Sequence, residues 1–136
     1  MSTVLFSSCI DLLAKAADAP QQLAQLRAAL GSAADDVVRE QVNRGIVALE
    51  QVTECQDRIQ TAITILKSDE PSKESLDEVK SLLFELSCAY LDGMCASRDE
   101  CIVHSIFGIP RGTMAGDLYN LAGDLDSMLY PEAYDF

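Results

Sequence analysis

Apolar side chains recur at alternating steps of four and three residues between residues 33 and 67. This spacing places them along one face of an α-helix and is typical of a heptad seam. The stripe is interrupted at Gly45 and Gln56. We therefore expect one long helix over 33–67, with Ser32 as its N-cap. Its seam against neighbouring helices would be formed by Val42, Leu49, Val52, Ile59, Ile63 and Leu66.

Helical periodicity also marks the segments on both sides of this helix. No segment alternates apolar and polar residues for long enough to build a sheet. The pattern predicts an all-α antiparallel helical bundle of four to five helices with one long central helix. Residues 1–129 would form a single helical domain, followed by an acidic-aromatic C-terminal tail at 130–136. The other expected helices cover 3–17, 20–30 closed by Gly31, a segment that starts at Ser72 or Lys73 and ends at Gly93 or Ser97, and 113–129.

The length of the central helix raises a packing question. At 1.5 Å per residue a helix over 33–67 would be about 50 Å long. A compact domain of this size is only about 36 Å across. Either Gly45 bends or breaks the helix, or its overhang packs on a second copy of the chain. A homodimer is therefore one of two expectations.

Negative charge is concentrated in the second half of the chain. Residues 1–68 carry eight acidic and six basic side chains, whereas residues 69–136 carry fourteen acidic and four basic ones. Such a field repels nucleic acid and anionic membranes and attracts basic proteins. No apolar run reaches the length of a membrane span. We expect a basic protein partner, no direct nucleic-acid contact and no membrane association.

The five cysteines favour a cytoplasmic protein with reduced thiols, because they are odd in number and embedded in apolar pattern. Cys88, Cys95, Cys101 and His104 are the ligand types of a zinc site. Their gaps of six, five and two residues do not match the short Cys pairs of structural zinc sites. Core packing is the favoured interpretation, so neither a metal nor another cofactor is expected.

Two catalytic roles can be considered for His104, and its neighbours in the sequence argue against both. It could act as the base for a Cys101 nucleophile, but the neighbouring Asp99 and Glu100 would raise the pKa of that thiol. It could be a phosphorelay histidine, but its neighbours are mostly apolar. No nucleotide-binding or hydrolase motif is present, and sequential carboxylates on a helix point apart. The chain is not expected to be an enzyme.

A small internal repeat distinguishes the last helix. Ala-Gly-Asp-Leu occurs at 115–118 and again at 122–125, which places Asp117 and Asp124 on one side of the helix with Asp126 close by. We expect a non-enzymatic protein-binding module, in the form of a small acidic inhibitor, immunity protein or nucleic-acid mimic that blocks a basic partner. The alternatives are a secretion or assembly chaperone and a coiled-coil subunit of a larger complex. The expected partner-binding residues are Asp117, Asp124, Asp126, Glu132 and Asp135.

Overall fold

The computed structural model describes residues 3–32, 35–93 and 113–134, and the regular structure in these ranges is helical throughout. The all-α helical bundle predicted from the sequence is confirmed. In chain order the elements are α1 (Thr3–Ala16), α2 (Ala19–Ser32), α3 (Asp36–Glu54), α4 (Gln56–Lys67), α5 (Lys73–Gly93), α7 (Thr113–Leu129) and the short 3-10 helix η1 (Pro131–Tyr134).

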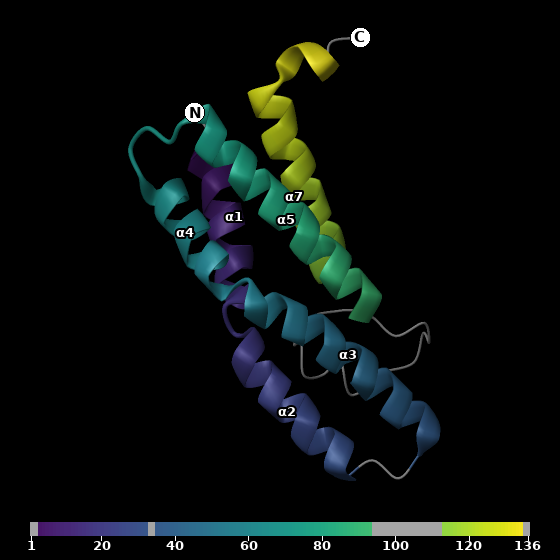
Figure 1. Ribbon diagram of the computed structural model, residues 1–136. Helices are drawn as coiled ribbons and strands as arrows, with labels where there is room; N and C mark the ends of the chain where they lie inside the picture. The colour runs from purple at the N-terminus through teal and green to yellow at the C-terminus, as the bar shows by residue number, and fades with distance from the viewer. Residues whose placement is uncertain (1–2, 33–34, 94–112, 135–136) are drawn as a thin grey trace.

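The helices form an elongated bundle with two parts (Figure 1). α1, α4, α5 and α7 pack together in the upper part, and α2 and α3 form an antiparallel pair that extends from its lower end. α3 also packs against α5, which joins the pair to the bundle. One cluster of buried apolar side chains runs through all of these helices.

The predicted long helix is divided at Cys55 into α3 and α4, so the expectation of a single central helix was wrong. At the break the Cys55 N–H donates to the carbonyl of Val52, three residues back. The Gln56 amide donates to the carbonyl oxygens of Ala16, at the end of α1, and of Val52, at 3.2 and 3.3 Å. A polar residue in the seam thus donates to carbonyl groups at the ends of two helices, α1 and α3.

Gly45 does not break the helix. It is buried within α3, which continues through it for 19 residues, or about 28 Å. This length fits within the domain. The overhang that suggested a second chain is therefore absent, and the argument from helix length for a homodimer no longer holds.

Two helix ends differ from the sequence prediction. Asp35, rather than Ser32, caps α3, because its carboxylate accepts a hydrogen bond of 2.7 Å from the Val37 N–H. Ser32 instead belongs to α2, which continues through Gly31. At the start of α5, Ser72 accepts a hydrogen bond from the Ser75 N–H, at the predicted position. A free carboxylate and a hydroxyl are both good caps, so the local pattern did not decide between Ser32 and Asp35.

Candidate functional site

The pairing of α5 with α7 is the most extensive helix contact among the described residues. The first residue of each Ala-Gly-Asp-Leu repeat, Ala115 or Ala122, is buried in this pairing region. The buried Ser87 of α5 donates a hydrogen bond of 2.8 Å to the Ala115 carbonyl oxygen. Small side chains and this hydrogen bond allow the two backbones to approach closely.

The glycines of the repeat serve a different face of α7. Gly116 and Gly123 are exposed, and a Cβ added at either position would meet no heavy atom within 4 Å beyond the local backbone. Tyr119 lies between them in the same helical stripe and is 59% exposed. Packing within the chain therefore explains the alanines but not the glycines.

A hollow of about 470 Å³ lies on this outward face, between α5 and α7. At one end the rings of Phe84 and Tyr119 meet across the two helices, with centroids 6.0 Å apart and planes at 47°. At the other end lie Lys80 and Asp126, which form an ion pair. The residues that line the hollow are Lys80, Ser81, Phe84, Glu85, Tyr119, Ala122, Gly123 and Asp126.

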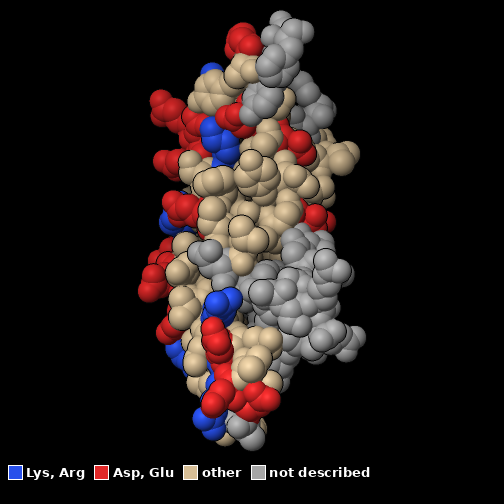
Figure 2. Space-filling view, turned by 90° about the vertical axis from the view of Figure 1, so that its right-hand side faces the viewer, with Lys and Arg blue, Asp and Glu red and all other residues tan. Residues whose placement is uncertain are grey.

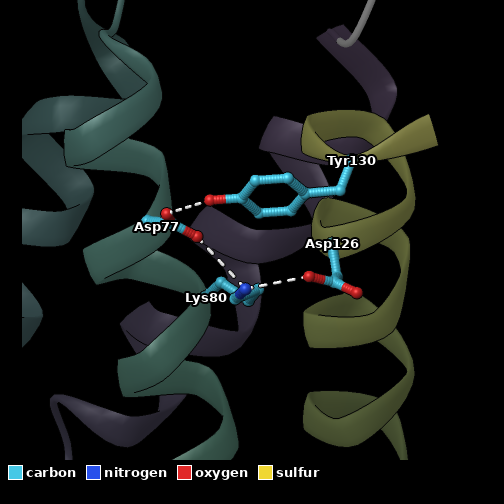
Figure 3. Close-up of polar contacts among 4 residues, drawn as sticks. All are labelled: Asp77, Lys80, Asp126 and Tyr130. Carbon is cyan, nitrogen blue, oxygen red and sulfur yellow. Dashed lines mark hydrogen bonds and ion pairs between the residues drawn. The ribbon is translucent and has the colours of Figure 1, made fainter. Parts of the chain in front are cut away.

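A polar cluster closes the charged end of this hollow (Figure 3). The Lys80 ammonium lies 2.9 Å from an Asp126 carboxylate oxygen and 3.1 Å from one of Asp77. The Tyr130 hydroxyl donates a hydrogen bond to the other oxygen of Asp77. The Lys73 ammonium stacks on the face of the Tyr130 ring, 4.2 Å from its centroid. Tyr130 therefore packs against α5, although the sequence pattern placed it in a tail outside the domain.

Contacts within the cluster hold Lys80, Asp77 and Tyr130 in their ordinary protonation states at neutral pH. The hydrogen bond to Asp126 raises the pKa of Lys80. The Tyr130 hydroxyl, followed by Lys80, lowers the pKa of Asp77, and Asp77 in turn raises the pKa of Tyr130. A lysine that stays protonated and a tyrosine that stays neutral are poor bases. The geometry instead ties the C-terminal end of α7 to the first turns of α5.

The surface around the hollow is acidic. α5 and α7 together contain eight acidic and two basic residues, and both basic residues, Lys73 and Lys80, contact Tyr130. α7 has no lysine or arginine. Figure 2 shows the side of the molecule on which α7 lies, where uncharged side chains fill the centre and acidic ones line mainly the left-hand edge. In this view a largely uncharged strip thus lies beside an edge where acidic side chains gather together with some basic ones.

The structure separates the aspartates that the sequence analysis grouped together. Asp117 and Asp124 are exposed, and Asp124 is close enough to the buried Cys9 of α1 to contribute to a raised thiol pKa. Asp126 is two residues after Asp124, so it is rotated by about 200° about the helix axis and lies on nearly the opposite side of α7. There it is paired with Lys80. Placing Asp126 beside the other two was therefore wrong, and its charge is neutralised. Glu132 is exposed on η1, and Asp135 lies outside the described residues.

The predicted seam residues lie on the inner faces of α3 and α4. Ile63 is partly buried and packs against the core. The other five are fully or almost fully buried: Val42, Leu49, Val52, Ile59 and Leu66. Their side chains contribute to the core of this chain, so they are not a surface for a partner.

The proposed zinc ligands are not testable as a group, because Cys95, Cys101 and His104 lie outside the described residues. Cys88 is exposed on α5, so the expectation that this cysteine packs in the core was wrong. Within residues 3–32, 35–93 and 113–134, no group of three or more His, Cys, Asp or Glu side chains is arranged to hold a metal. Burial, with a smaller contribution from Asp124, raises the pKa of the Cys9 thiol to about 12, so this cysteine is unreactive at neutral pH.

Sequence reasoning missed the residues that shape the hollow. Phe84 and Tyr119 looked like ordinary helix residues. Tyr130 is too far from Asp77 and Lys80 in sequence for the three to be recognised as a cluster. The available signal was the pair of glycines in the repeat. Glycine is less favourable than alanine inside a helix, and Gly123 lies in the interior of α7, so its presence indicated a surface that needs space.

Comparisons with protein-family models, with curated proteins and with solved structures find no match to this chain. In the part of the chain that the structure describes, no helix combines the length and the apolar character needed to cross a bilayer. The functional argument therefore depends on the geometry of the α5–α7 face.

Proposed function

We propose that this protein is a non-enzymatic protein-binding module that docks a basic partner on the outward face of α5 and α7. The observation that carries the proposal is a hollow with the exposed Phe84 and Tyr119 at one end and the Lys80–Asp126 ion pair at the other, between two helices rich in acidic residues. Interfaces commonly combine an apolar centre that includes aromatic residues with a polar rim. An acidic rim would also accelerate encounter with a basic protein and disfavour acidic competitors.

The ion pair and the hollow favour some forms of protein-binding module over others. A nucleic-acid mimic needs unpaired carboxylates, and the pairing of Asp126 with Lys80 removes one of the three on α7. A small inhibitor or immunity protein can use the apolar hollow as well as the acidic rim. The hollow also supports the second candidate, a secretion or assembly chaperone, because such proteins hold an apolar segment of their client. A cytoplasmic location, based on the free thiols, stays a prediction.

The proposal is tested by comparing two charge-matched variants for binding to a basic partner recovered by affinity capture. The first, Asp117→Asn with Asp124→Asn, neutralises exposed carboxylates of α7. The control, Asp11→Asn with Glu54→Gln, neutralises exposed carboxylates of α1 and α3. Surface plasmon resonance at low and physiological salt should show slower association only for the first variant. Equal small effects, or binding that does not respond to salt, would contradict the proposal.

The two forms of the module differ in what happens to the partner. An inhibitor should leave its partner folded and block its activity. A chaperone should bind a segment of an unfolded partner and release it on folding. Hydrogen exchange of the bound partner distinguishes these outcomes, because only a folded partner keeps its core amides protected.

A further inference from the structure

We propose that the hollow over Gly123 receives one large apolar side chain from a basic amphipathic helix of the partner. This inference rests on the proposed protein-binding function and specifies its site and its ligand chemistry. The hollow has an alanine and a glycine among its lining residues, an aromatic pair at one end and an ion pair at the other. A leucine, methionine or phenylalanine inserted there would bury apolar area against Phe84 and Tyr119.

The direction of the groove favours a helical ligand. Gly116, Tyr119 and Gly123 follow one another at steps of three and four residues, so they form a stripe along α7. α5 runs beside this stripe and contributes Phe84, with the exposed Leu91 two turns further on. An amphipathic helix that lies in the groove between two helices meets such a stripe with its own side chains at helical spacing.

The two glycines give an independent indication of close approach. Glycine within a helix is less favourable than alanine, and neither Gly116 nor Gly123 has a neighbour in this chain that a Cβ would meet. Internal packing therefore does not require them. A partner helix that approaches the backbone of α7 would require small residues at these positions.

The charge of the α5–α7 face determines which kind of partner helix fits it best. α7 has no basic residue, and the charge of Lys80 is outweighed by its two partners, Asp77 and Asp126. Glu85, the other carboxylate that lines the hollow, is paired with Arg58 of α4. The acidic groups of α7 that a ligand can meet are therefore the exposed Asp117 and Asp124. A second copy of this chain would bring a further net charge of −12 against an acidic face. Lysine and arginine beside the apolar anchor would instead lie near the carboxylates of that face. The surface therefore fits a basic helix better than a homodimer.

The inference is tested with a synthetic amphipathic peptide of about 18 residues, long enough to form a helix, with leucine on one face and lysine on the other. Amide shifts of the ¹⁵N-labelled full chain are followed as the peptide is added. We expect the largest shifts at Gly123 and its neighbours in the hollow. A glutamate-for-lysine version of the peptide should not bind, because its charge has the same sign as the protein surface.

Gly123→Leu provides the decisive variant, because a Cβ at this position meets no heavy atom within 4 Å and the rest of the side chain would occupy the hollow. It should weaken peptide binding about tenfold or more. Gly31→Leu, at an exposed glycine near the end of α2 with equally open surroundings, is the matched control and should bind as the wild type does. Thermal melting of both variants checks that the fold is retained, and Gly123→Ala provides a milder substitution at the same site.

Three results would overturn the inference: no binding of the lysine peptide, shifts centred on another face, or unchanged affinity in Gly123→Leu. The broader proposal fails differently. If a captured basic partner binds Gly123→Leu normally but loses affinity for the Asp117 and Asp124 double variant, the anchor site is wrong and the acidic docking surface stands. If neither variant affects the partner, both proposals fail.

Discussion

Replacing Ser87 by valine tests the close packing of α5 on α7, on which the hollow depends. Ser87 is 6% exposed, and its hydroxyl donates to the Ala115 carbonyl oxygen at 2.8 Å. Ser87→Ala removes this hydrogen bond and should destabilise the protein by about 1 kcal/mol. Ser87→Val also inserts a methyl group where the small Ala115 faces α5. Overpacking of this kind typically costs about 1–3 kcal/mol more.

The two variants should therefore differ in thermal unfolding followed by circular dichroism. For a chain of 136 residues, 1 kcal/mol corresponds to a shift in Tm of about 4 °C. We expect Ser87→Ala to melt a few degrees below the wild type and Ser87→Val to melt about 8 °C or more below it. If valine is tolerated as well as alanine, the helices are not close at this point. The account of the alanines in the repeat would then be wrong.

Two further predictions concern titratable groups. Asp77 has a lowered pKa in the fold, so its contribution to stability should be present above about pH 4 and lost as the pH falls through the folded pKa. The difference in unfolding free energy between the wild type and Asp77→Asn should therefore shrink in acid. A difference that stays constant with pH would argue against the cluster. Cys9 should resist alkylation at pH 8 in the folded protein and react only on unfolding, whereas the exposed Cys88 should react at once. Peptide mapping by mass spectrometry measures the labelling of both cysteines, and rapid labelling of Cys9 would refute its burial.

Local pattern was sufficient for most of the helices. The segment over 113–129 was predicted with the bounds that the structure shows, and α1 and α5 begin where the sequence placed them. Helical periodicity arises from contacts within a few residues, so it can be read along the chain. The same reasoning failed at Cys55, where the chain meets a distant element: Gln56 donates to the end of α1, 40 residues earlier in the chain.

At the candidate site, even less could be predicted from the sequence, and more depended on the tertiary structure. From the sequence alone came the acidic second half, the paired Ala-Gly-Asp-Leu repeat and the absence of a recognised catalytic motif. Only the tertiary structure decided which carboxylates are unpaired. Lys80 and Asp126 are 46 residues apart and Asp77 and Tyr130 are 53 apart, and they meet because α5 and α7 pack side by side. Charge and periodicity are properties of the chain, whereas a hollow and its rim are made by the packing of two helices.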